Sequence, residues 1–347
     1  MPVSDAKSRL GRAFVQFPFE LYQHEAQWVP PLRSALGVLI NQTHPFFAHS
    51  AGQAFLLVRD SAIVGRFMVL DPVLYNQHRG TQDARIFLPE AVYDDEVWDT
   101  LFVTARQWAE QRGASQLIGP LGPSPWLGPG VLVEGFEHTA AMTQTPWHHR
   151  WYHQQFERHE FVPHREYLSY YQTQPGTAGV SASDEMTVSR LENREELGRL
   201  AREIGQHWEE YHPLSPAEMD RLLYDYAPTG HSIQSLTVRN ASGELAGFML
   251  YSVDLSPALQ RSNGYVGVRT ILDLHREARR AKHLIVCGLG VLPPYQPHDV
   301  TVLLYGELVQ EMKQRGIDSL ETTFDPQSTK VFGDHVYKRH RVYVQTL

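Results

Sequence analysis

The order of hydrophobic and polar residues predicts a similar series of strands and helices in the two halves of the chain. In the first half, residues 53–59 and 63–70 have the pattern of paired strands, and residues 95–112 carry apolar side chains at helical spacing. In the second half, strands are predicted at 233–239 and 245–253, on either side of a short polar turn. This order predicts an α+β protein with mixed central sheets flanked by helices.

A change in composition divides the two halves. Residues 173–185 are rich in Gly, Ser, Thr and Ala and have no apolar periodicity, which is typical of a linker. We therefore expect an N-terminal lobe at 1–172 and a C-terminal lobe at 186–347.

The second half contains a strand–turn–helix that resembles a phosphate-binding scaffold. The apolar run 284–292 predicts a buried strand, and a helix follows the next turn, with Leu304, Leu308 and Met312 on one face. The first N–H groups of a helix have no partner within it, so such a turn readily binds an anion. Here Pro297 lacks an N–H group, and the carboxylate of Asp299 is expected to cap the helix and to repel phosphate.

Charge and cysteine content narrow the class of protein. The formal net charge is −8 without a basic run, so we expect neither nucleic acid nor an anionic membrane as a partner. The single cysteine, Cys287, excludes an internal disulfide framework and favours a cytoplasmic location; its plainest interpretation is a small buried hydrophobe. The N-terminus lacks the apolar core of a signal peptide. The sequence leaves the oligomeric state open.

Histidines cluster between residues 148 and 164. His149 and His153 are four residues apart, a spacing that places both on one face of a helix and that is found in zinc sites. The intervening residues include Arg150 and no glutamate, which favours packing among the neighbouring aromatic residues, so we predict no metal. His283 and Cys287 are too far apart along a strand to form a convincing nucleophile pair.

Particular residues give the chain a family resemblance. Val291, Pro293, Gln296 and the helix from residue 301 resemble the strand, V-x-P turn and Q/R-x-x-G-x-G/A loop of the GNAT superfamily of N-acyltransferases. The whole chain resembles a tandem-GNAT family of bacterial proteins through FPFELY (17–22), WVPPLR (28–33), HPFF (44–47), GP…VEGF (119–136) and YKRHRVY (337–343). The resemblance implies two GNAT-like lobes in tandem.

Both lobes depart from the family's loop. Pro297 and Asp299 occupy the positions of the loop glycines, so the pyrophosphate loop of the second lobe is predicted to be degenerate. In the first lobe, residues 86–98 carry three acids and no glycine at the equivalent turn, so this lobe is also predicted to be degenerate.

The resemblance also implies a site. It predicts an N-acyltransferase that moves an acyl group from acetyl coenzyme A, another acyl thioester or an acyl carrier protein to a small amine. The implied cofactor contacts are Leu289, Val291, Gln296, His298 and Val300.

The implied catalytic residues are Glu321 as base, for which an exposed strand carboxylate is the plainer reading, and Tyr337 or Tyr343 as acid. Candidates for the lining of a substrate cleft are Ser124, Trp126, Glu134, His149 and His153. The alternative is a catalytically silent GNAT-fold protein that binds a ligand or assembles with other proteins.

Overall fold

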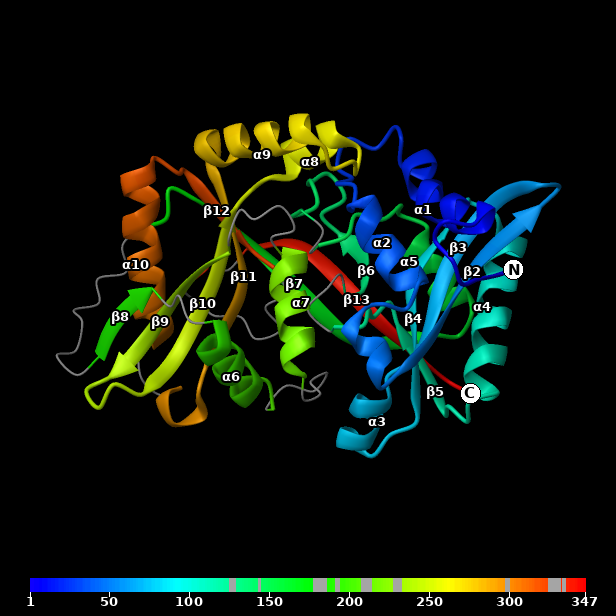
Figure 1. The fold of residues 1–347 in the computed structure, drawn as a ribbon, viewed down its shortest axis with the longest axis horizontal. Coiled ribbons are helices and arrows are strands. Elements are labelled where there is room, and N and C mark those ends of the chain that lie inside the picture. Colours follow the sequence, from blue (N-terminus) through cyan, green and yellow to red (C-terminus); the bar gives the residue numbers. More distant parts are fainter. Residues whose placement is uncertain are drawn as a thin grey trace. The chain divides into compact units, whose positions relative to one another are not determined.

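In the computed structural model the chain forms two compact units, which we call unit 1 and unit 2 (Figure 1). Unit 1 comprises Met1–Tyr167, Ala258–Thr270 and Lys338–Leu347, and unit 2 comprises Leu168–Pro257 and Ile271–Tyr337. The structure describes residues 1–124, 129–142, 145–176, 186–190, 194–206, 214–226, 233–296, 300–323, 332 and 335–347. In these described ranges, no helix is long and apolar enough to cross a bilayer.

Unit 1 is built on a mixed sheet with the strand order β1-β2-β3-β4-β5-β13. The predicted pair β2–β3 is antiparallel, whereas β4 and β5 are parallel. The strands are β1 (Pro2–Val3), β2 (Ala51–Arg59), β3 (Ala62–Asp71), β4 (Asp83–Ala91), β5 (Gln116–Gly119), β6 (Val131–Glu134), which pairs with β13, and the first part of β7 (Val162–Thr173). The helices are α1 (Arg9–Leu21), α2 (Arg33–Ile40), the 3-10 turn η1 (Pro45–Ala48), α3 (Val73–Arg79), α4 (Asp95–Glu110) and α5 (Tyr152–Arg158).

Alternation along β3 separates the core of unit 1 into two layers. Phe67 and Val69 pack in one hydrophobic cluster with Trp98 of α4, and the intervening Met68 packs in a second cluster with Phe14 of α1. Successive side chains of a strand point to opposite faces. Helices α1 and α4 therefore cover opposite faces of this sheet, and the predicted apolar face of α4 is confirmed as buried.

Unit 2 has a second mixed sheet, ordered β7-β12-β11-β10-β9-β8. Its strands are β8 (Met186–Arg190), β9 (Gln234–Asn240), β10 (Leu245–Val253), β11 (His283–Val291), β12 (Ser319–Thr322) and the last part of β7. The helices are α6 (Arg194–Gly205), α7 (Pro216–Tyr226), the 3-10 turn η2 (Pro293–Tyr295) and α10 (Val300–Arg315). Helices α8 (Ser256–Ser262) and α9 (Val268–Arg280) connect β10 to β11, and residues 258–270 of this connection belong to unit 1. The predicted strand–turn–helix is confirmed as β11, η2 and α10.

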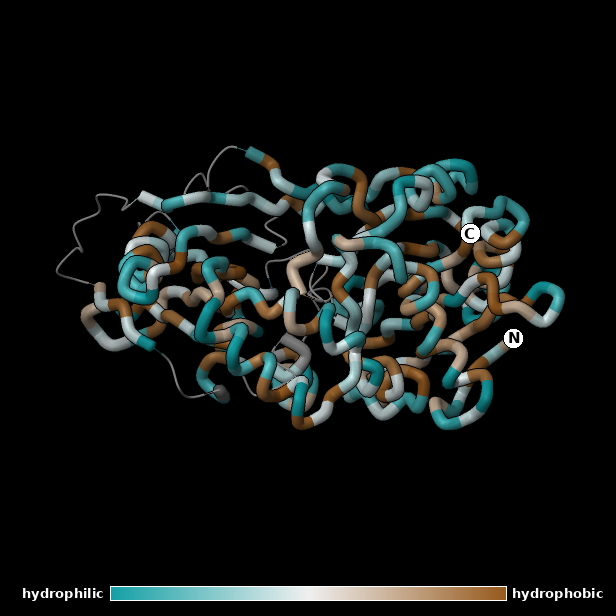
Figure 2. Tube along the Cα trace, turned by 90° about the horizontal axis from the view of Figure 1, so that it is seen from above, coloured by the Kyte–Doolittle hydropathy of each residue, from teal (hydrophilic) through white to brown (hydrophobic). Residues whose placement is uncertain are grey.

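Two glycines show which helices cover which face of this sheet. A Cβ atom at Gly290 would lie 2.8 Å from Ile204 of α6, and one at Gly247 would lie 2.9 Å from Val300 of α10. Gly247 pairs with Val291, the neighbour of Gly290, so the two glycines face opposite ways. Helices α6 and α10 thus lie on opposite faces of β10 and β11. Figure 2 shows hydrophobic and hydrophilic residues interleaved along the elements, as helices and strands with one buried face require.

The closing strand of each sequence half completes the sheet of the other unit. Residues 343–346 of β13 pair antiparallel with β5 in unit 1, and residues 171–173 of β7 pair antiparallel with β12 in unit 2. Segment 338–347, which contains most of β13, belongs to unit 1, and so does segment 258–270. Both segments follow residue 186 in the sequence, where the C-terminal lobe was expected to begin. Most of the expected linker, residues 177–185, lies outside the described residues.

A buried ion pair crosses β3 and β4 in unit 1. Arg66 is 1% exposed and its Nε lies 2.5 Å from the carboxylate of Glu90, the residue directly opposite it in the ladder. The same guanidinium donates through Nη1 to the carbonyl of Phe14 at 2.8 Å. Removing one member would leave a charge or an unpaired polar group in the core, which is far more costly than losing an exposed pair.

We predict that Arg66→Met lowers the free energy of unfolding by about 3–5 kcal/mol, because Glu90 then has no cationic partner in the core. The matched control is Arg158→Met, which breaks a largely exposed pair with Asp99 and should lower the free energy of unfolding far less. Urea denaturation of both variants measures the difference. Equal costs for the two substitutions would contradict this description of the core.

Candidate functional site

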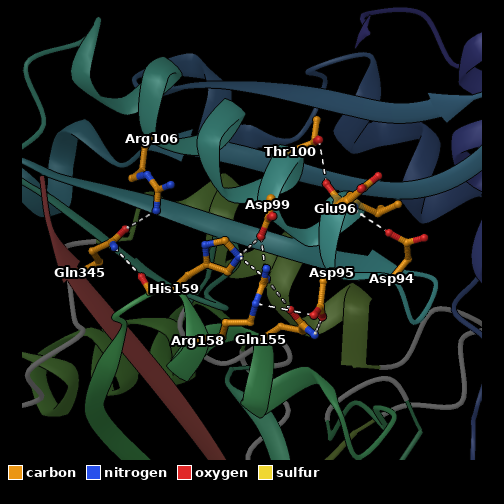
Figure 3. Close-up of polar contacts among 11 residues, drawn as sticks. Asp94, Asp95, Glu96, Asp99, Thr100, Arg106, Gln155, Arg158, His159 and Gln345 are labelled. Atoms are coloured by element: carbon orange, nitrogen blue, oxygen red, sulfur yellow. Dashed lines mark hydrogen bonds and ion pairs between the residues drawn. The ribbon is translucent and has the colours of Figure 1, made fainter.

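The N-terminus of α4 in unit 1 is occupied by its own acidic residues. Asp94 caps the helix by accepting a hydrogen bond from the backbone N–H of Val97 at 3.2 Å, and Asp95 and Glu96 follow in the first turn. Figure 3 shows these carboxylates and the polar side chains that surround them. An anionic ligand would meet like charges here.

The acids of this helix are also paired. Arg59 contacts Asp94 at 2.8 Å, and its guanidinium lowers the pKa of that carboxyl group. Asp99 lies 2.6 Å from Arg158 and 3.0 Å from His159, and Arg158 lowers its pKa (Figure 3). The carboxylates are therefore stabilised in their charged form, which disfavours a bound phosphate further.

Aromatic side chains occupy the region beside β4 in unit 1. The last β4 residue registered with β5 is Arg85, although β4 itself continues to Ala91. Tyr152 and Tyr22 are at most 1% exposed, their hydroxyl oxygens lie 3.0 Å apart, and the Tyr152 hydroxyl also contacts the backbone of Ala91. Burial raises the pKa of both phenols, so they stay neutral and fill this region as core residues.

The predicted helical pairing of His149 and His153 does not occur. Helix α5 begins only at Tyr152, so His149 precedes it, and the His149 ring stacks on Trp151 with centroids 4.0 Å apart. Burial lowers the pKa of His149 to about 4 and that of His148 to about 3. Over the residues that the structure describes, no cluster of His, Cys, Asp and Glu has the geometry of a metal site.

The remaining candidates in the first half have separate surroundings in unit 1. Ser124 is buried, Glu134 is exposed and pairs with Arg339 at 3.1 Å, and Trp126 lies outside the described residues. Tyr343 also belongs to unit 1, where it stacks on Phe156 and donates to Glu157 at 3.2 Å. Burial raises the pKa of Tyr343 to about 12.

In unit 2, the short parallel strand β12 is paired along its whole length with the beginning of β11. Their registered pairs run from His283 opposite Ser319 to Val286 opposite Thr322, and the Thr323 N–H then donates to the Val286 carbonyl at 3.0 Å. On its other side, β11 remains paired with β10 as far as Val291. Residues 287–291 therefore extend beyond the registered pairing with β12.

A β-bulge in β11 directly follows Val286, the last residue registered with β12. Leu250 of β10 is opposite Gly288, whereas the next residue, Tyr251, is opposite Val286, so Cys287 is the extra residue on β11. Cys287 is buried, as predicted. A bulge re-aims the backbone groups beside it, which suits a site at which an extended ligand approaches the strand.

The implied cofactor residues follow this point along the chain. Leu289 and Val291 are half-buried on β11, Gln296 is exposed after η2, and Val300 is the buried first residue of α10. His298, together with Pro297 and Asp299, lies outside the described residues.

Polar side chains gather at the beginnings of β11 and β12. Glu321 is 3% exposed, which corrects the plainer expectation of an exposed carboxylate. Its Oε2 lies 3.7 Å from Nε2 of His283, and Nδ1 of that ring lies 2.9 Å from Oγ of Ser319. The other ring contacts of this group stack Tyr171 on His283 and Tyr337 on Tyr171, at centroid distances of 5.3 and 4.8 Å.

Register explains why this group, which we call the Glu321 cluster, forms on one face. Ile285, Glu321 and Tyr171 are directly opposite one another on three adjacent strands, and His283 and Ser319 are two residues earlier on theirs. The sequence analysis named Glu321 and Tyr337 but missed the contributions of His283, Ser319 and Tyr171. Each comes from a different strand or strand end, so only the pairing brings them together.

Asp254 adds a second carboxylate beside the cluster. Its backbone N–H donates to the His283 carbonyl at 3.0 Å, and its side chain accepts from the N–H of Ser256 at 2.8 Å. Burial raises the pKa of Asp254, and the nearby charge of Glu321 acts in the same direction. A carboxylate at Glu321 would attract a cationic ligand such as an ammonium group to this place.

We predict that the neutral His149 makes unit 1 less stable in acid. Its folded pKa of about 4 lies below its unfolded value, so the unfolded chain binds the extra proton, and stability falls as the pH drops from about 6.5 towards 4. In His149→Gln, the loss of stability between about pH 6.5 and 4.5 should be smaller by up to about 1.4 kcal/mol per pH unit. Exposed His24→Gln is the control, and urea denaturation at several pH values is the measurement. An unchanged pH dependence in His149→Gln would contradict the neutral state.

The sequence of this chain is similar to parts of two known proteins. No protein-family model matches the chain. The chain is 29% identical over 141 residues to Protein YghO of Escherichia coli (strain K12), and the matched region covers 41% of this chain and 36% of that protein. It is also 30% identical over 128 residues to the bacterial ceramide synthase of Caulobacter vibrioides (strain NA1000 / CB15N), where the matched region covers 36% of this chain and 33% of that protein. The matched regions thus span about a third of each relative.

The fold is similar to solved structures along the entire chain. A tandem GNAT protein from the clavulanic acid biosynthesis pathway matches with a TM-score of 0.61 and 11% sequence identity, over 100% of this chain and 97% of that one. Unit 2 has the strand–turn–helix that carried the resemblance, and both units have a pair of parallel strands, β4 with β5 and β11 with β12. The chain has the GNAT fold in its tandem form.

Proposed function

We propose that the chain is an N-acyltransferase whose active site lies in unit 2, along the part of β11 that extends past β12 and beside the Glu321 cluster. The donor is an acyl thioester, carried by coenzyme A or by a carrier protein, and the acceptor is an amine. The observation that carries the proposal is the end of the β11–β12 register at Val286, next to the buried Glu321.

The geometry of β11 supports binding of an extended thioester arm. A strand that extends past its neighbour presents backbone N–H and C=O groups along its edge, and an extended ligand with amide groups pairs with such an edge as a further strand does. In the part of the chain that the structure describes, residues 288–291 extend beyond the registered partner. The implied contacts Leu289 and Val291 lie within this segment.

The Glu321 cluster supplies groups for proton transfer. An amine arrives as ammonium at neutral pH, and the carboxylates of Asp254 and Glu321 attract that charge. Glu321 then accepts a proton, so that the neutral nitrogen attacks the thioester carbon. The N–C bond forms, the C–S bond breaks, and the departing thiolate takes up a proton, for which Tyr337 is the candidate donor. The nitrogen gives up its second proton to the resulting phenolate, so that the only proton released overall is the one taken up by Glu321. We assign Tyr343 no role in this step because it is a core residue of unit 1.

The relatives support the same class of reaction. One of them is named a bacterial ceramide synthase, and a ceramide is an amide of a long-chain amino alcohol. The match covers a third of that protein, so the acceptor and acyl chain of the present reaction are part of our proposal.

Pro297 and Asp299 favour a second candidate function, a GNAT-fold protein that binds or assembles without catalysis. They replace the glycines that would approach a pyrophosphate. A carrier-linked thioester needs no pyrophosphate contact at this turn, and for this reason we prefer acyl transfer with an unusual donor.

We predict that Glu321→Gln lowers kcat by about 10²–10⁴, because the amide cannot accept the proton. The matched control is Glu311→Gln. Glu311 is a second buried glutamate of unit 2, on α10, and its carboxylate is paired with Arg190 at 2.7 Å. Thiol release from palmitoyl coenzyme A, acetyl coenzyme A and an acylated carrier protein, with long-chain and short-chain amines as acceptors, gives the rates. Absence of release by the wild-type chain from all donors would overturn the proposal, as would equal rates for Glu321→Gln and the wild type.

We also predict that the double substitution Pro297→Gly and Asp299→Gly strengthens coenzyme A binding at least about a hundred-fold. It restores a backbone donor worth about 1.5–3 kcal/mol and removes a like charge worth roughly 1–4 kcal/mol. Pro294→Gly, in the adjacent turn η2, is the control. Calorimetric titration measures the affinities, and equal affinity in the wild type and the double variant would show that this turn does not limit binding.

A further inference from the structure

Helix α9 leaves much of its apolar face in water. Leu274 is fully buried, whereas Val268 is 76%, Leu272 53% and Ile271 43% exposed. The turn before the helix adds two exposed side chains, Tyr265 at 60% and Val266 at 52%. Five large apolar residues within eight positions are thus exposed, although single exposed apolar residues are the norm on soluble proteins.

The helical repeat places these residues on one side. Val268 and Leu272 are four residues apart, and Ile271 is adjacent to this row, about a quarter of a turn away. Leu274 and the half-buried Ala278 face the protein from the neighbouring side. The packing of α9 therefore uses only one edge of its apolar face.

Cationic residues continue the same exposed side. Helix α9 carries four arginines, all exposed, against two acids: Arg269, Arg276, Arg279 and Arg280 against Asp273 and Glu277. Arg276 follows Leu272 by four residues and therefore lies on the same row. Lys282, also exposed, follows the helix. The total charge of −8 hides this local excess of positive charge.

We propose that α9 is an interfacial membrane-binding helix, which lies in the headgroup layer of an anionic bilayer. The five apolar side chains at 265–272 point to the acyl chains, and the arginines pair with lipid phosphates. A strongly amphipathic helix with an apolar edge and an arginine-rich polar edge is the pattern that binds in this way. The sequence analysis expected no anionic membrane as a partner because the net charge is −8 and no basic run occurs. Our proposal instead considers the local positive charge of α9.

The combination of side chains on this helix favours lipid over a protein partner. Exposed apolar residues suit the acyl chains and the neighbouring arginines suit anionic headgroups, so the helix matches both layers of a membrane interface. An acidic carrier protein or a second copy is therefore an alternative outcome of the test.

Vesicle co-sedimentation tests the proposal without requiring activity. The full chain should sediment with vesicles of phosphatidylcholine and phosphatidylglycerol, and at least about ten-fold less with phosphatidylcholine alone, because the arginines need anionic lipid. Ile271→Glu with Leu272→Glu should reduce binding at least about ten-fold, and so should Arg276→Glu with Arg279→Glu. Val103→Glu, at a valine of α4 that is 41% exposed, should leave binding unchanged.

Circular dichroism shows whether each variant is folded. Wild-type binding that is absent, or that is the same in the α9 variants, would overturn the proposal. So would an effect of these variants only on binding to an acylated carrier protein, or only on the oligomeric state in size-exclusion chromatography. Acyl transfer in detergent-free solution is measured separately, so failure of membrane binding leaves the proposed reaction intact.

Discussion

The main constraint on the site is that the short strand β12 covers only the beginning of β11, whereas β11 stays paired on its other side with β10 as far as Val291. Among the described residues, 288–291 of β11 therefore have a registered neighbour on the β10 side alone, and a strand edge of this kind can pair with an extended ligand. The bulge at Cys287 follows the last residue registered with β12, and α6 and α10 cover the two faces of the sheet. The rest of the functional account depends on this arrangement, because it provides a place for an extended thioester beside buried proton-transfer groups.

The two units place different residues around equivalent parallel strands. In unit 1, Tyr22 and Tyr152 fill the region beside β4, and the first turn of α4 is crowded with paired carboxylates. In unit 2, the polar Glu321 cluster lies on the sheet face opposite α10. In unit 1 this region is therefore filled by core residues, and the ion pair between Arg66 and Glu90 is part of the same core. This contrast is our reason for assigning the proposed chemistry to unit 2 alone.

The sequence predicted the parts of the fold that depend on local periodicity. The predicted helix after the two-proline turn is α10, and the hairpin strands are β9 and β10, because apolar spacing and turn residues specify such elements directly. The Glu321 cluster needed the register of β7 against β12, which pairs Tyr171 with a residue far along the chain, and no local pattern contains that information. The sequence predicted Tyr343 and Tyr337 as alternative acids because no local pattern distinguishes them. In the structure Tyr343 lies on β13, paired with β5, in the core of unit 1. The exposed apolar residues of α9 look like core residues in the sequence, and only their burial in the structure distinguishes them.

Hydrogen exchange measured by mass spectrometry tests the central claim most directly. The amides of residues 288–291 should exchange more slowly when an acyl thioester, offered as palmitoyl coenzyme A or as an acylated carrier protein, occupies the edge of β11, because an extended ligand would pair with their backbone groups. The corresponding residues of β4 in unit 1 should be unaffected, since aromatic side chains already fill that region. Unchanged exchange in β11 with every donor, or protection that appears in β4 instead, would contradict the account.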